Sequence, residues 1–195
     1  MKTLWKVREA AEALGQCLPR MSSLATLELI GVDGSVLQAE QMDALFGSFS
    51  EELPLCRLIV QRFSMRGCLA PLCDCLRFFP KLEYLDIGEV SLNEHNFFHL
   101  LWGVRCIPNL MSLTVKGQRQ IPFHADCSER VETEVSCTLA ALQILSLSGI
   151  TLNPAVVRAL GRLLPQMSLD SLFVKEGIVL QTGETEALQI GRAHV

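Results

Sequence analysis

A short apolar block recurs six times along the 195-residue chain, in the form Leu-x-x-Leu-x-Leu with Val or Ile allowed at the last position. The blocks begin at Leu24, Leu55, Leu82, Leu110, Leu142 and Leu169, and successive starts lie 31, 27, 28, 32 and 27 residues apart. Alternating apolar positions are typical of a strand with one buried face. Their return at a nearly constant period predicts a stack of similar units.

The residues before several blocks repeat as well, in an apolar-Pro-x-apolar pattern. It is found at 18–21, 79–82, 107–110 and 164–167. Proline cannot continue a helix and favours extended geometry in the residue before it. The segments 66–80, 93–108 and 153–165 have helical apolar spacing and each ends at such a proline. Each unit is therefore predicted to run strand, turn, helix, turn. Pro71 interrupts the pattern of the segment 66–80 and is compatible with a helix only in its first turn.

Neighbouring units must cover each other, because each has an apolar strand face and an apolar helix stripe that it cannot bury alone. Stacking joins the strands into one parallel sheet and aligns the helices on its other side. Strands pack closer together than helices do, so the stack is expected to bend toward the sheet. The expected fold class is α/β, a horseshoe-shaped solenoid with the parallel sheet on the concave side and the helices on the convex side.

The blocks at 24–32, 81–92, 109–117 and 141–152 resemble leucine-rich repeats of the ribonuclease-inhibitor type. The proline-containing segments at 17–29 and 163–172 are similar to the C-terminal repeat arrays of NOD-like receptors, including their MHC-transactivator-like branch. The resemblance covers roughly residues 1–180. It departs from the family where Val32, Val90 and Ile150 replace the usual Asn or Cys, so the ladder of hydrogen bonds made by those residues is in doubt.

This resemblance implies a protein-protein interaction module of a larger intracellular protein, a ligand-sensing or autoinhibitory array in innate immunity or its regulation. Any nucleotide-binding module would lie outside this sequence. An adaptor or scaffold, for example for a ubiquitin ligase, is an alternative. A thiol-dependent enzyme fragment that uses the cysteine-rich second repeat is a further one.

One leucine-rich-repeat domain of about six repeats is expected over residues 1–189, with an irregular loop at 117–127 and a helix at 128–140. The loop is either a binding loop or a tolerated insertion. The last six residues, Ile-Gly-Arg-Ala-His-Val at 190–195, read like a translated sequencing adapter. We therefore expect the natural chain to continue past Gln189.

Charge and composition argue against several classes of function. The formal net charge is −4, whereas a nucleic-acid or anionic-membrane surface needs concentrated basic residues. No apolar run is long enough to span a bilayer, and the N-terminus carries charges where a secretory signal would be apolar. A cytoplasmic location, with the nucleus as an alternative, is expected. The eight cysteines are then thiols, and burial is predicted for Cys17, Cys56, Cys73 and Cys106.

Catalytic and metal-binding patterns are weak. His95 and His99 share a helical face, but no second ligand pair accompanies them. Cys127 and His124 lie close in sequence without a third partner. No phosphate-binding loop or nucleophile elbow occurs. We expect no catalytic residue, no cofactor and no metal site.

The residues between the block leucines should line the concave sheet face, because side chains alternate along a strand. We single out six residues of this face that carry charge or an aromatic ring of the kind that anchors protein interfaces. These candidates for a protein-binding surface are Glu28, Arg57, Tyr84, Asp86, Lys116 and Phe173. A protein partner is expected, and neither nucleic acid nor a membrane.

Overall fold

The computed structural model describes residues 2–32, 36–47, 49, 52–65, 69–90, 99–100, 102–117, 142–149 and 169–175. Most of the expected loop at 117–127, the expected helices at 128–140 and 153–165, and the segment 190–195 lie outside these residues. So do His95, His124, Cys68, Cys127 and Cys137.

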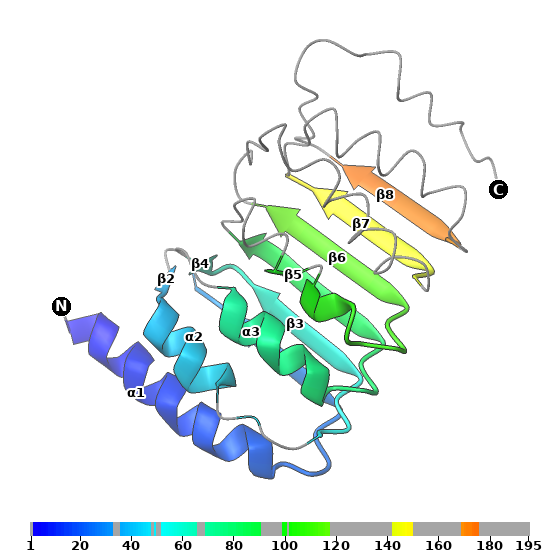
Figure 1. The fold of residues 1–195 in the computed structure, drawn as a ribbon. Helices are drawn as coiled ribbons and strands as arrows, with labels where there is room; N and C mark the ends of the chain where they lie inside the picture. The colour runs from blue at the N-terminus through cyan, green and yellow to red at the C-terminus, as the bar shows by residue number, and fades with distance from the viewer. Residues whose placement is uncertain are drawn as a thin grey trace.

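Six strands form one sheet in which all neighbours are parallel (Figure 1). They are β1 (Thr26–Ile30), β3 (Arg57–Gln61), β5 (Tyr84–Val90), β6 (Ser112–Gly117), β7 (Ile144–Ser148) and β8 (Ser171–Lys175). Their order in the sheet is their order in the chain. Each strand begins two residues after the first leucine of its block. The predicted parallel sheet is confirmed.

The strand register places equivalent leucines of all six blocks beside each other. The central leucines form one row across the sheet, Leu27, Leu58, Leu85, Leu113, Leu145 and Leu172. From Leu58 to Leu145 this row is buried, whereas Leu27 and Leu172 on the two outermost strands are half-buried. The period-two alternation of the blocks therefore turns one face of every strand toward the core.

The helices lie along one side of this sheet in the described part of the chain (Figure 1). They are α1 (Lys2–Cys17), α2 (Ala39–Phe46) and α3 (Ala70–Cys75), and residues 99–100 and 102–104 also have helical backbone. Short 3-10 turns, η1 (Leu18–Arg20) and η2 (Leu76–Phe78), follow α1 and α3. Pro71 lies in the first turn of α3, where a helix tolerates proline. No helix among the described residues is long and apolar enough to cross a membrane.

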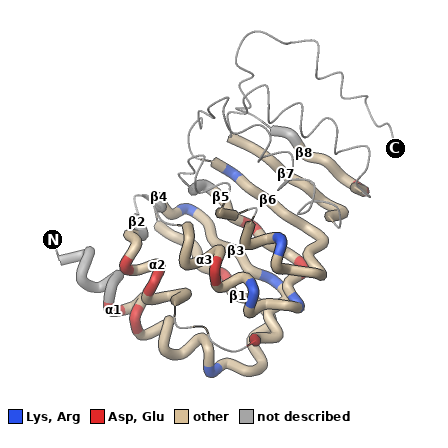
Figure 2. Tube along the Cα trace, in the orientation of Figure 1, with Lys and Arg blue, Asp and Glu red and all other residues tan. Residues whose placement is uncertain are grey.

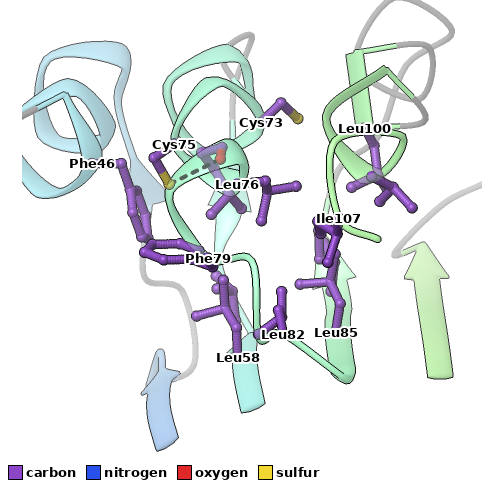
Figure 3. Close-up of a cluster of buried hydrophobic side chains, with 14 of the residues drawn as sticks. Phe46, Leu58, Cys73, Cys75, Leu76, Phe79, Leu82, Leu85, Leu100 and Ile107 are labelled. Carbon is purple, nitrogen blue, oxygen red and sulfur yellow. Dashed lines mark hydrogen bonds between the residues drawn. The ribbon is translucent and has the colours of Figure 1, made fainter. Parts of the chain in front are cut away.

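The core lies between the helices and the sheet and is largely aliphatic (Figure 3). Leu76 of η2 belongs to the same buried cluster as Leu58 and Leu85 of the strands, and all three are fully buried. Phenylalanines fill the gap between repeats, where the Phe49 and Phe79 rings meet edge to face with centroids 5.2 Å apart. Such aromatic pairs stabilise a core beyond the area that they bury.

Backbone hydrogen bonds join successive repeats just before each strand. They run from Cys56 N to Ala25 O, Glu83 N to Cys56 O, Met111 N to Glu83 O, Gln143 N to Met111 O and Asp170 N to Gln143 O, with lengths of 2.8–2.9 Å. Asn109 adds a side-chain link, because its Nδ2 donates to Pro80 O at 2.8 Å. These bonds connect neighbouring repeats even though Val32 stands where the resembling family has Asn or Cys, and Val32 is exposed.

A second, two-stranded parallel sheet was not predicted. It pairs β2 (Val36–Leu37) with β4 (Ser64–Met65). At the nearby end of β1, Gly31 N donates to Gln61 O at 2.9 Å, and a Cβ on Gly31 would lie 2.4 Å from the Arg62 carbonyl oxygen. Only glycine fits there without a shift of the backbone.

The cysteine predictions are correct in part. Cys73 and Cys75 are buried, and Cys56 is half-buried. Burial raises the pKa of the Cys75 thiol well above its usual value, helped by the neighbouring Cys73 and Asp74. Cys75 Sγ lies 3.0 Å from Leu72 O, the dashed line in Figure 3.

The predicted burial of Cys17 and Cys106 is wrong, since both are exposed. Cys17 is the last residue of α1. Cys106 lies in the turn after a helix, where its Sγ is 3.8 Å from the carbonyl oxygen of the exposed Trp102. Both cysteines lie at the end of a helix with their side chains exposed to solvent. None of the five described cysteines forms a disulfide.

Candidate protein-binding face

The strand side chains that alternate with the core leucines form the sheet face opposite the helices, which we call the open face. The register arranges them in rows. The first row is Thr26, Arg57, Tyr84, Ser112, Ile144 and Ser171. The second row is Glu28, Ile59, Asp86, Thr114, Ser146 and Phe173. The third contains Ile30, Gln61 and Gly88 on β1, β3 and β5, and Lys116 and Ser148 on β6 and β7. All six predicted candidates belong to the open face.

The candidates do not form one cluster. Four of them lie on the adjacent strands β3, β5 and β6, namely Arg57, Tyr84, Asp86 and Lys116. Glu28 lies on β1 at one edge of the sheet, and Phe173 lies on β8 at the other. Charged residues of both signs occur along the described chain without a large block of one sign (Figure 2).

Arg57 and Tyr84 form a stacked pair across β3 and β5. The Arg57 guanidinium carbon lies 4.2 Å from the centroid of the Tyr84 ring. A cation over an aromatic face is attracted by the ring quadrupole. The contact holds the exposed arginine over the half-buried ring, so the pair presents a charge and an aromatic edge at fixed positions.

Asp86 differs from the surface aspartate that the pattern predicted, because its side chain is only 8% exposed. Gln61 Nε2 donates to Asp86 Oδ2 at 2.8 Å. Asp86 Oδ1 is buried and has no hydrogen-bond partner among the described residues. A buried acceptor without a donor is rare and destabilising.

The pKa of Asp86 is raised above its usual value, and the main cause is desolvation by burial. The Gln61 hydrogen bond, the Tyr84 hydroxyl and the positive charges of Arg57 and Lys116 act in the opposite direction and lower the pKa. Burial is therefore the larger effect. The carboxylate has too few donors to offset its loss of water.

Gln61 and Gly88 belong to this site although neither was singled out as a candidate. A Cβ on Gly88 would lie 2.9 Å from Gln61 Cγ and 3.3 Å from Asp86 Oδ1. The Gln61 side chain therefore occupies the space that the missing Gly88 side chain leaves. Strand register could have identified Gln61, because Gln61 and Asp86 are diagonal neighbours on adjacent strands.

Apolar side chains flank the polar centre of the open face. Ile30 on β1 is 54% exposed, Ile144 on β7 is 37% exposed and Phe173 on β8 is 45% exposed. Ile144 and Phe173 lie on adjacent strands one row apart. Exposed apolar side chains of this kind are what the core of a protein interface buries.

Metal-binding groups are not assembled in the part of the chain that the structure describes, where no group of three or more His, Cys, Asp or Glu side chains could hold an ion. His99 is half-buried, and its expected partner His95 lies outside the described residues. No protein-family model matches this chain, and no curated protein matches it.

Proposed function

We propose that this chain is a leucine-rich-repeat solenoid of horseshoe shape that binds other proteins through its open face, which would be the concave side. The sequence period and the parallel sheet with helices on one side support this architecture. The shape would present a broad surface of strand side chains to a partner. In this proposal the chain has no catalytic role, and it binds neither nucleic acid nor membranes specifically.

The observation that carries the proposal is the stacked pair of Arg57 and Tyr84 on a sheet face that none of the described helices covers. Arginine and tyrosine are enriched among residues that dominate binding energy at protein interfaces. Holding the pair in place before binding reduces the entropy lost on association. The apolar side chains of Ile144 and Phe173 extend the same face toward β8.

From the resemblance of the repeats we infer that this module belongs to a larger intracellular protein, as a ligand-sensing or autoinhibitory array of a NOD-like receptor. A reducing compartment, the cytoplasm or the nucleus, suits a chain whose exposed Cys17 and Cys106 are thiols. The partner is a protein.

A face-specific crosslinking experiment tests the proposal. A photoreactive amino acid replaces Thr114 on the open face or, in a second protein, Asp74 on the helix side, and crosslinked proteins are identified after irradiation in cells. We expect partners from position 114 that Arg57→Ala removes. The matched control is Arg77→Ala, because Arg77 also stacks on a ring, 4.8 Å from the centroid of Phe78, but in the helix layer. Equal crosslinking from both faces, or equal loss with both arginine variants, would contradict the proposal.

A further inference from the structure

Asp86 is the centre of a three-by-three arrangement of side chains on the open face. Its members are Arg57, Ile59 and Gln61 on β3, Tyr84, Asp86 and Gly88 on β5, and Ser112, Thr114 and Lys116 on β6. The register pairs them across the strands except Gly88 and Lys116, where it shifts after Ile87. The two cationic residues occupy opposite corners. The carboxyl group is the only acidic side chain among the nine, so the arrangement is built around it.

The carboxyl group of Asp86 is half-satisfied. Its Oδ2 accepts a hydrogen bond from Gln61 Nε2, and its Oδ1 has no donor among the described residues. Two carboxylate oxygens offer about four acceptor positions. Asp86 Oδ1 can therefore accept at least one more hydrogen bond, and a donor that reached it would stabilise the ionised form of Asp86.

The side chain of Gln61 packs beside the Asp86 carboxyl group. Its side chain lies over Gly88, because a Cβ at that glycine would be within 2.9 Å of Gln61 Cγ. Gln61 is half-buried and has a flexible unbranched stem, so the stem can shift toward solvent while the amide stays on Asp86 Oδ2. The shift would expose Asp86 Oδ1 above a glycine that has no side chain to block an approaching chain.

Charge decides which kind of donor fits. Arg57 and Lys116 are exposed and already place two positive charges around one carboxylate. A further cation would be repelled by both, and an anion would meet the Asp86 carboxylate. The groups that donate to it, the Gln61 amide and the Tyr84 hydroxyl, are both uncharged, so an uncharged donor fits beside this carboxyl group.

We propose that the open face binds an extended segment of a partner protein through an uncharged amide N–H, from a carboxamide side chain or from the backbone, that donates to Asp86 Oδ1 once the Gln61 stem shifts off Gly88 while its amide stays on Oδ2. The inference rests on the proposed function, since it names the group that the protein-binding face recognises. Asp86 anchors the segment, and the Arg57–Tyr84 pair and the apolar residues near β8 contact its flanks.

A random linear peptide library displayed on phage, selected on the full chain, supplies the probe. Selected peptides are synthesised, and their affinity is measured for the wild type, Asp86→Asn, Glu28→Gln, Arg57→Ala and Arg77→Ala. Asp86→Asn keeps the shape but puts an NH2 group where the free oxygen was. We expect it to weaken binding about tenfold or more, as is usual for a lost buried hydrogen bond to a charged group. Glu28→Gln, an exposed carboxylate in the same row, should change affinity less than about twofold.

Peptide variants separate the two sources of the amide. If a carboxamide donates, alanine in place of one Asn or Gln should reproduce the loss, and if the backbone donates, one N-methylated amide should do so. Neither change should weaken binding further to Asp86→Asn. Carbon-13 NMR of the Asp86 carboxyl group gives an independent readout, since a bound donor should lower its titration midpoint.

Each of the other possible results would overturn a specific part of the proposal. Affinity lost with Arg57→Ala but kept with Asp86→Asn would overturn the amide anchor and leave the proposed function standing. A peptide anchored on Asp86 by Lys or Arg would overturn the uncharged donor. Peptides indifferent to Arg57→Ala and Asp86→Asn alike, or a selection that yields no binder, would overturn the proposed function together with this inference.

Discussion

Gly149 approaches Gly117 so closely that a Cβ on Gly149 would lie 2.4 Å from the Gly117 carbonyl oxygen. Gly149 also has a φ of +63°, in the left-handed region that side chains rarely adopt. Gly117 is the last residue of β6 and Gly149 directly follows β7, so their contact joins adjacent repeats where these strands end. Backbone conformation and close approach both require glycine at position 149.

Gly149→Ala is therefore expected to destabilise the fold. The left-handed backbone costs an alanine roughly 1–2 kcal/mol, and the contact with Gly117 adds to that cost. Urea unfolding followed by circular dichroism measures the change. The neighbouring Ser148→Ala, at a half-exposed position, should change stability by no more than about 0.5 kcal/mol. Equal effects of the two variants would contradict the close approach.

Leu85 is the central leucine of β5 and has no exposed surface. Leu85→Ala should lower the free energy of unfolding by about 2–5 kcal/mol, because it removes buried methyl groups and leaves a cavity between the sheet and the helices. Val32→Ala is the matched control, since Val32 is 75% exposed and should tolerate truncation within about 0.5 kcal/mol. The same urea titration distinguishes them, and a small effect at Leu85 would mean that it does not face the core.

The strands could be predicted from the sequence because the signal was local and repeated. Leu82, Leu85 and Ile87 show both the alternation of one strand and its place in the period, and β5 begins two residues after Leu82. The sheet formed by β2 and β4 could not be predicted, because two-residue strands such as Val36–Leu37 carry no periodic pattern. The burial of Cys106 was predicted wrongly, because a leucine-rich neighbourhood does not reveal which way a single side chain at a helix end points.

The sequence predicted which residues lie on the open face, but it did not predict their burial or their contacts. Alternation placed Asp86 on the open face, which the register confirms. Its burial depends on Gln61 and Tyr84, and Gln61 lies 25 residues away along the chain. Side-chain direction in the folded sheet decides that contact, and no local pattern encodes it. The stacking of Arg57 on Tyr84 was equally invisible, because it requires the exact register of β3 and β5.

Thiol modification tests the correction at the cysteines. Cys17 and Cys106 are exposed and should react readily with an alkylating reagent in the native protein, whereas Cys73 and Cys75 should be protected until unfolding. Mass spectrometry after short labelling identifies each site. Cys17→Ser and Cys106→Ser should each remove one fast-reacting position. Rapid labelling of Cys75 under native conditions would be incompatible with its burial.

The titration of Asp86 should contribute to the pH dependence of folding stability. Its folded pKa is raised by burial, so between its ordinary pKa and that raised value the native state binds more protons than the unfolded state. The contribution of Asp86 to stability therefore falls as pH rises through this window. The ionised carboxylate is a net cost above it.

Asp86→Asn resembles the protonated side chain and should remove this dependence. We expect the variant to gain stability relative to the wild type near neutral pH, and to lose that advantage as the pH approaches about 4. Urea unfolding of both proteins across this range measures the difference. Glu28→Gln, which removes an exposed carboxylate from the same face, reports the effect of one lost negative charge alone. An advantage of Asp86→Asn that grew as the pH fell would reverse the sign and mean that Arg57, Lys116 and Gln61 stabilise the Asp86 carboxylate more than burial opposes it.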